Sequence, residues 1–152
     1  MSDASTLIEP IRKVVTVNCS VERAFRVFTA ELGTWWPLNS HSIGDENAVT
    51  AVIEPKAGGR VFERWNDGSE HSWGAVLAWE PPHRFAISWR PNPGALAPTE
   101  VEVAFVEEDG ATRVYLEHRG WERLGARASA ARAQYDGGWP VVLGKFAQNA
   151  SA

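Results

Sequence analysis

The chain has 152 residues, of which 44% are hydrophobic and 22% are charged, and this favours one compact domain over residues 1–152. The formal charge of −4 at pH 7 argues against nucleic acid as a partner, because that binding needs a basic surface for the phosphate backbone. No apolar run reaches the roughly 18 residues of a spanning helix. We therefore expect no membrane insertion.

The cysteine content and the N-terminal segment predict a cytoplasmic protein. Cys19 is the only cysteine, which excludes an intrachain disulfide and a thiolate metal cluster, as expected in a reducing compartment. Residues 1–10 carry Asp3 and Glu9 and lack the basic and apolar regions of a secretory signal peptide. We expect these ten residues to be flexible.

The N-terminal third predicts one strand followed by one or two short helices. Residues 11–18 are rich in β-branched side chains and favour a strand. Ser20 is a suitable N-cap for a helix whose apolar residues recur at spacings of three and four up to Leu32. The aromatic segment 34–38 fits one further helical turn, and a polar stretch follows over residues 39–47.

From residue 48 onward the apolar residues alternate with a period of two, which predicts an antiparallel meander. Gly, Pro, Asn and Asp residues with turn-forming preferences separate the strands. The expected strands cover residues 48–54, 60–65, 70–79, 83–89, 99–107 and 112–118.

The C-terminal part returns to a helical period. An apolar stripe begins at Trp121 and stays in phase to Phe146. Pro140 interrupts the pattern, because it has no amide hydrogen to donate to the preceding turn. We therefore expect one long helix with a kink or a short interruption near Asp136.

This order of elements predicts an α+β fold. A strongly curved antiparallel sheet of about seven strands cannot bury its concave face alone, so we expect it to wrap around the long C-terminal helix. Eight of the residues are tryptophan. Large indoles can fill such a core or can wall a cavity between sheet and helix, and composition alone leaves both interpretations open.

Several short motifs along the chain occur together in one known family. They are Ser20 to Phe25, Trp35-Trp36-Pro37, Glu54-Pro55, Gly58-Gly59-Arg60, Asp67-Gly68, Trp73-Gly74, Trp79-Glu80-Pro81-Pro82, Arg84, Trp89, residues 112–118, and Gly138-Trp139 with Leu143. With these motifs the chain, from about Ile11 to Phe146, resembles the START/birch-pollen-allergen-like (SRPBCC) superfamily. Within it, the sequence is similar to the group that contains the C-terminal domain of the activator of heat-shock-protein-90 ATPase. The resemblance implies a helix-grip fold with a ligand pocket, and in some members an aromatase/cyclase site.

Two polar residues fall on the strand faces that we expect to face the helix. By alternation that inner face carries Val61, Glu63, Trp65, Trp73, Ala75, Leu77, Trp79, Phe85, Ile87, Trp89, Val101, Val103, Phe105, Val114, Leu116 and His118. Glu63 would need a partner there, because a lone buried carboxylate is costly, and His118 could pair with it or meet a ligand. In the alternative interpretation, a bulge turns Glu63 to solvent and His118 is a structural histidine.

The candidate ligand-binding residues combine aromatic faces with a few polar groups. They are Trp35, Trp36, His41, Glu63, Trp65, Trp73, Trp89, His118, Tyr135 and Trp139. The aromatic side chains would supply apolar contact, and His41 lies in a segment that can cover one end of the cavity. Glu63 and His118 would orient a polar group, or serve as the acid and base of an enzyme.

No pattern indicates a metal or a nucleotide cofactor, and we expect neither. The four histidines include no H-x-x-x-H or H-E-x-x-H spacing. The sequence also lacks a G-x-S-x-G nucleophile motif, a G-x-G-x-x-G fingerprint and a P-loop.

Three functions remain open at this point. The leading hypothesis is binding of a hydrophobic or aromatic small molecule between the sheet and the C-terminal helix. The alternatives are a cyclase/aromatase- or hydrolase-type enzyme that uses polar pocket residues, and a chaperone-associated interaction module, which the resemblance alone suggests. A homodimer and a chaperone contact are the protein partners that these hypotheses leave open.

Overall fold

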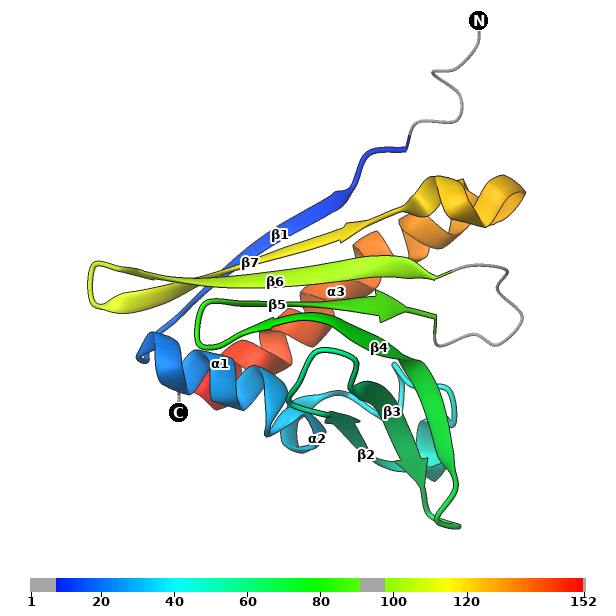
Figure 1. Cartoon of the computed structure of the whole chain (residues 1–152), viewed down its shortest axis with the longest axis horizontal. Coiled ribbons are helices and arrows are strands. Elements are labelled where there is room, and N and C mark those ends of the chain that lie inside the picture. The colour runs from blue at the N-terminus through cyan, green and yellow to red at the C-terminus, as the bar shows by residue number, and fades with distance from the viewer. Residues whose placement is uncertain (1–7, 91–97, 152) are drawn as a thin grey trace, which may run out of the picture.

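The computed structural model describes residues 8–90 and 98–151 (Figure 1). In chain order its elements are β1 (Ile11–Val17), α1 (Val21–Thr29), α2 (Leu32–Trp35), η2 (Asp45–Asn47), β2 (Ala48–Ile53), β3 (Arg60–Trp65), β4 (Glu70–Glu80), β5 (Arg84–Trp89), β6 (Thr99–Glu108), β7 (Ala111–Arg119), η3 (Trp121–Arg127) and α3 (Ala128–Ser151). This is the predicted order, and the predicted α+β helix-grip fold is confirmed.

The strands of the described chain form one seven-stranded antiparallel sheet in the order β1-β7-β6-β5-β4-β3-β2. Each of the strands β2 to β6 pairs with the next strand in sequence, whereas β1 pairs with β7, the last strand of the meander. The sheet curls, and the long helix α3 lies across it with α1 near the C-terminal end of that helix (Figure 1). The space between the sheet and α3 therefore holds the core.

Strand β4 departs from the regular alternation that its sequence predicts. Its register shifts twice, against β3 next to Gly74 and against β5 between Val76 and Ala78, and a bulge of this kind exchanges the two faces of a strand. As a result the prediction for Leu77 is wrong, because this side chain is 49% exposed while Val76 is buried. At Gly74 φ is 153°, and a Cβ would lie only 1.9 Å from the Ser88 carbonyl oxygen.

The end of the core beneath α1 is filled by aromatic side chains. Ser20 caps this helix as predicted, and its buried face carries Phe25 and Phe28. The ring of Phe25 lies 5.2 Å from that of Phe105, and the ring of Phe28 lies 4.8 Å from that of Phe146. Between Phe28, Leu32 and the sheet a void of only about 10 Å³ remains, which is at the lower limit for a single water molecule.

Helix α3 runs without interruption through Pro140, so of the two predicted forms, a kink or a short interruption near Asp136, the interruption is wrong. The break falls earlier, at Gly125 in η3, where φ is 59° and ψ is −127°. The buried face of α3 consists of Ala128, Trp139, Val142, Leu143, Phe146 and Ala150. Packing of this face against the core outweighs the one helical hydrogen bond that a proline removes.

Part of the outer face of the sheet carries a network of ion pairs. Arg119 pairs with Glu100, Glu102 and Glu117 at distances of 3.3, 2.7 and 3.2 Å, and Arg84 pairs with Glu102 at 2.5 Å. Among the helices of the described ranges, none is both long and apolar enough to cross a membrane.

Candidate functional site

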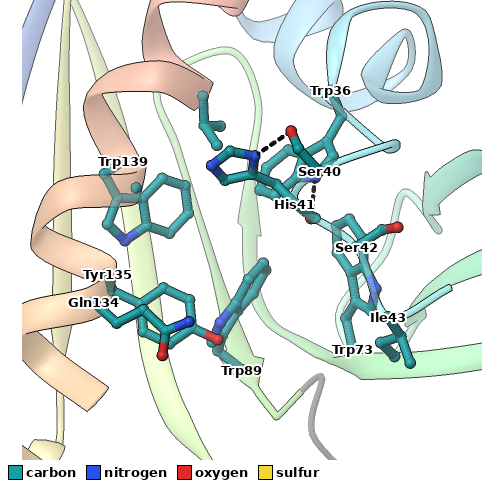
Figure 2. Close-up of a pocket in the computed structure, with 12 residues that line it drawn as sticks. Trp36, Ser40, His41, Ser42, Ile43, Trp73, Trp89, Gln134, Tyr135 and Trp139 are labelled. Atoms are coloured by element: carbon teal, nitrogen blue, oxygen red, sulfur yellow. Dashed lines mark hydrogen bonds between the residues drawn. The ribbon is translucent and has the colours of Figure 1, made fainter. Parts of the chain in front are cut away.

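A pocket of about 420 Å³ lies between α3, the sheet and the segment that precedes β2 (Figure 2). It is lined by Trp36, Ser40, His41, Ser42, Ile43, Trp73, Trp89, Gln134, Tyr135, Gly138, Trp139 and Val142. Figure 2 shows Tyr135 and Trp139 extending from α3 on one side of this space, with the segment 40–43 on the other. The volume lies within the roughly 300–1,000 Å³ typical of small-molecule pockets.

Four indoles form most of the apolar wall, and we call Trp36, Trp73, Trp89 and Trp139 the indole cluster. The ring centroids of Trp36 and Trp73 are 4.9 Å apart, those of Trp73 and Trp89 are 5.3 Å apart, and those of Trp89 and Trp139 are 5.8 Å apart. All four side chains are buried. Because each indole is held by contacts with the others, the wall is rigid and its faces are already in place.

Most of the indole N–H groups find an acceptor within the described chain. Trp35 donates to the Val27 carbonyl, Trp36 to the His41 carbonyl, Trp65 and Trp73 to the Glu63 carboxylate, Trp121 to the His118 carbonyl, and Trp139 to His118 Nδ1. Trp79 is only half-buried. The buried N–H of Trp89 is the exception among them, since no described group accepts from it. Leaving such a donor unpaired costs about 1–3 kcal/mol.

Glu63 ties the pocket-lining segment to the sheet. Its carboxylate is fully buried and accepts four hydrogen bonds. The backbone N–H groups of Ile43 and Gly44 each donate over 2.8 Å, and the indoles of Trp65 and Trp73 donate over 2.8 and 2.6 Å. A carboxylate has acceptor sites for all four donors, so the expected cost of burying it is offset. Glu63 thus faces inward, not toward solvent.

The same segment lies flat against Trp65. A Cβ on Gly44 would come within 2.5 Å of the Trp65 ring, so a larger residue does not fit there unless the segment moves. On its other side, Trp65 stacks on His71 with a centroid distance of 3.7 Å. The position of the pocket wall over residues 40–44 therefore depends on close packing at Gly44 as well as on the Glu63 carboxylate.

His118 supports the pocket from behind. Trp139 Nε1 donates to His118 Nδ1 over 3.0 Å, and since an indole N–H can only donate, Nδ1 carries the lone pair and Nε2 the proton. Nε2 donates to Thr99 Oγ1 over 2.7 Å, and that hydroxyl donates to the Trp89 carbonyl over 3.2 Å. Burial lowers the pKa of His118 to about 3, so the ring is neutral near pH 7.

Few polar groups reach the pocket itself. Ser40 Oγ lies 2.7 Å from His41 Nδ1, and Gln134 is exposed at the edge. Burial raises the pKa of the Tyr135 phenol, while the nearby Trp89 indole partly opposes that rise, so the phenol keeps its proton. No Lys, Arg, Asp or Glu is among the lining residues of the described chain.

The pocket brings together part of the predicted set of ligand-binding residues. Trp36, His41, Trp73, Trp89, Tyr135 and Trp139 line it, whereas Trp35, Glu63, Trp65 and His118 do not. Trp35 packs into the core beside Phe28 and Phe146. Glu63 and His118, which could have formed a pair, each have other hydrogen-bond partners and are not bonded to one another.

Six lining residues were not among the sequence candidates, namely Ser40, Ser42, Ile43, Gln134, Gly138 and Val142. The sequence does contain a pattern that could have identified the last three of them. Gln134, Gly138 and Val142 follow one another at spacings of four, beside Tyr135 and Trp139, and such spacing places residues on one side of a helix. Residues 40–43 carry no periodicity, so their place could not be inferred.

Nothing in the described residues forms a metal centre. No group of three or more His, Cys, Asp or Glu side chains lies close enough together there to hold an ion. The chemistry available in the pocket is therefore that of aromatic faces, of a few neutral polar groups and of the His41 imidazole.

A family model described as "Activator of Hsp90 ATPase homolog 1-like protein" matches residues 18–151. This match confirms the group within the SRPBCC superfamily to which the motifs pointed. No curated protein matches the sequence closely enough to count as a relative.

Several solved structures are similar to this chain over nearly its whole length. An anthrahydroquino-gamma-pyrone synthase, Txn09, complexed with SUM, is 36% identical with a TM-score of 0.62, over 94% of this chain and 97% of that one. CalC from Micromonospora echinospora, described as a self-sacrificing resistance protein, is 32% identical with a TM-score of 0.70, over 93% of both chains. The Aha1 dimer from Colwellia psychrerythraea, 18% identical with a TM-score of 0.67 over 95% of this chain and 97% of that one, shares the fold.

Proposed function

The chain belongs to the activator of Hsp90 ATPase homolog 1-like family, and we propose that it binds a hydrophobic or aromatic small molecule in the pocket between the sheet and α3. One observation carries the proposal. The indole cluster and its neighbours enclose about 420 Å³ without filling it. An apolar concave pocket with a small number of polar groups is the usual form of a small-molecule site.

The shape of the free space favours a compact planar ligand over a long acyl chain. Behind the indole cluster, between Phe28 and the sheet, the free volume is only about 10 Å³, so the pocket does not extend in that direction. Its walls are flat indole faces that are fixed by their own contacts. Aromatic rings gain about 0.5–1.5 kcal/mol per pair from offset or edge-to-face contacts, beyond the burial of their area, so a planar aromatic ligand fits this wall best.

Two neighbours above 30% identity support a small-molecule role. The synthase is named for an anthrahydroquino-gamma-pyrone, which is a fused aromatic ring system, and the other is a resistance protein. We place this binding in the cytoplasm, where the free thiol of Cys19 is stable.

Titration of the intrinsic tryptophan fluorescence tests the proposal, because the indole cluster lines the site. The panel consists of planar aromatic compounds, steroids and fatty acids. We expect saturable quenching by the planar aromatic compounds. The absence of saturable quenching by any compound of the panel would remove the proposal.

A matched pair of glycine variants ties the signal to this pocket. Gly138 lines it, and a Cβ there would lie 3.8 Å from His41, so Gly138→Leu directs a side chain into the free space. Gly137 is the neighbouring helical glycine, does not line the pocket, and has open space around a Cβ. We expect at least tenfold weaker binding for Gly138→Leu and unchanged binding for Gly137→Leu. Equal affinity in the two variants would place the ligand elsewhere.

Acid–base catalysis on the bound ligand is a second candidate function. It is favoured by the 36% identity to a synthase and by His41, whose imidazole lines the pocket with Nδ1 held by Ser40. Glu63 and His118 are not proposed as the acid and base, because they lie behind the wall. If His41 is the acid or base, His41→Gln should bind the ligand with unchanged affinity but should no longer convert an anthrahydroquinone-type substrate. The absorbance of the substrate measures the conversion. Turnover that is unchanged in the variant would exclude His41.

A further inference from the structure

The pocket contains one buried hydrogen-bond donor that the protein leaves unpaired. Trp89 is 7% exposed and lines the pocket, yet no group in the described ranges accepts from its Nε1–H. The other three members of the indole cluster all donate within the protein, to His41, Glu63 and His118. Buried donors of folded proteins are normally paired, so this N–H marks a place where an acceptor is missing.

The nearest polar group at this end of the pocket does not supply that acceptor. The rings of Trp89 and Tyr135 are 6.3 Å apart at an angle of 80°, and the two side chains approach one another in Figure 2. Burial raises the pKa of the Tyr135 phenol, and the Trp89 N–H points near enough to its oxygen to oppose part of that rise, but the contact lacks the geometry of a formed hydrogen bond. A phenol hydroxyl can accept or donate, and with an acceptor in the pocket it donates. Two donors, Nε1–H of Trp89 and the hydroxyl of Tyr135, therefore meet at one end of an apolar space.

We infer that the ligand carries a neutral carbonyl oxygen, which accepts a hydrogen bond from Trp89 Nε1 with the Tyr135 hydroxyl as second donor. This inference rests on the proposed function and specifies the ligand further. The chemical class is that of planar aromatic ketones and quinones.

The lack of charged side chains in the pocket, together with its two donors, favours a neutral carbonyl over other ligand groups. The lining residues of the described chain include no Lys or Arg, and burial of a carboxylate without a cationic partner is strongly unfavourable. A ligand amine would bring further donors to a place that already has two. An aromatic hydrocarbon would enter the pocket but would leave the Trp89 donor unpaired.

The test compares three ligands of one ring shape, 9-fluorenone, fluorene and fluorene-9-carboxylate. We expect the full chain to bind fluorenone about fivefold to tenfold more tightly than fluorene, which is the ratio that one additional hydrogen bond provides, and to bind the carboxylate most weakly. In spectra of ¹⁵N-labelled protein, the Trp89 Nε1–H resonance should shift downfield with fluorenone and not with fluorene.

Two variants serve as controls for the donors. Trp89→Phe should reduce the preference for fluorenone to about twofold, the share left to the Tyr135 hydroxyl, with the shifted resonance absent from its spectrum. Tyr135→Phe, at a partly exposed position, should reduce the preference for fluorenone about twofold. If Trp89→Phe does not fold, the wild-type resonance and Tyr135→Phe still decide the question.

The outcomes separate the ligand class from the proposed function. Equal binding of fluorenone and fluorene, with the Trp89 resonance unmoved by either, would overturn the carbonyl inference and leave the binding pocket standing. Tightest binding of the carboxylate would likewise overturn it. If none of the three ligands binds, the proposed function fails together with the inference.

Discussion

The Trp139 indole donates a hydrogen bond to Nδ1 of His118 over 3.0 Å, and this contact joins the pocket wall on α3 to the end of β7. The imidazole must be neutral to accept it, because a proton on Nδ1 would face a second N–H. The position of Trp139, and with it one wall of the pocket, therefore depends on the protonation state of a buried histidine that does not line the pocket.

This relation predicts how stability depends on pH. Burial lowers the pKa of His118 to about 3, while in the unfolded chain it is near 6.5. Between these values the unfolded state binds a proton that the folded state does not, so the free energy of unfolding falls by about 1.4 kcal/mol for each pH unit of acidification. Urea unfolding at pH 7 and pH 5 should show wild type losing about 2 kcal/mol more than His118→Gln. An identical pH dependence of the two proteins would contradict the prediction.

Replacing the Glu63 carboxylate should strongly lower the free energy of unfolding, because four buried hydrogen bonds depend on it. In Glu63→Gln an NH₂ group replaces one oxygen and faces N–H donors that have lost their acceptor. We expect a loss of about 2–4 kcal/mol in the free energy of unfolding, measured with urea. Glu107→Gln, at an exposed position on β6, is the control and should change stability by less than about 0.5 kcal/mol. Similar effects of both substitutions would show that the four hydrogen bonds are not important for stability.

The close packing of Gly44 on Trp65 predicts a combined loss of stability and binding. A Cβ would lie 2.5 Å from the indole, so Gly44→Ala must displace the segment that lines the pocket. We expect about 1–3 kcal/mol of destabilisation together with weaker binding of aromatic ligands. In Gly144→Ala, a helical position with open space around the Cβ, stability should stay equal or rise by up to about 1 kcal/mol. Thermal unfolding and fluorescence titration of both variants measure these effects.

Two tryptophans of the indole cluster should respond differently to the same substitution. Trp73→Phe removes a donor that holds the Glu63 carboxylate at 2.6 Å, whereas Trp89→Phe removes a donor with no partner. Without ligand, we expect Trp73→Phe to be the more destabilising of the two by about 1–2 kcal/mol. If Trp89→Phe costs as much as Trp73→Phe in urea unfolding, the Trp89 N–H has a partner in solution.

The order of the elements could be predicted because each one carries its own local signal. Ser20 as a cap, the alternation of Val101, Val103 and Phe105, and the stripe that ends at Phe146 are visible in a few residues each. The faces of β4 were predicted less well, because alternation assumes an unbroken register and two bulges change it. Leu77 was misplaced for this reason.

The candidate site could be predicted only in part. Tyr135 and Trp139 share a helical face, and Trp73 and Trp89 lie on neighbouring strands. The predicted fold was therefore sufficient to place these four side chains at one site. The segment 40–43 has no period. Its position depends on Glu63, which is 20 residues from Ile43 in sequence, and on the absence of a side chain at Gly44. Contacts of this kind between distant residues leave no pattern in either segment.

Native mass spectrometry of the protein incubated with 9-fluorenone counts the ligands on the folded chain and so shows whether the pocket is occupied. We expect one bound ligand per chain for wild type and Gly137→Leu, and none at the same concentration for Gly138→Leu. A spectrum without the complex in wild type, or with the same complex in Gly138→Leu, would contradict the claim that the pocket between the sheet and α3 is the binding site.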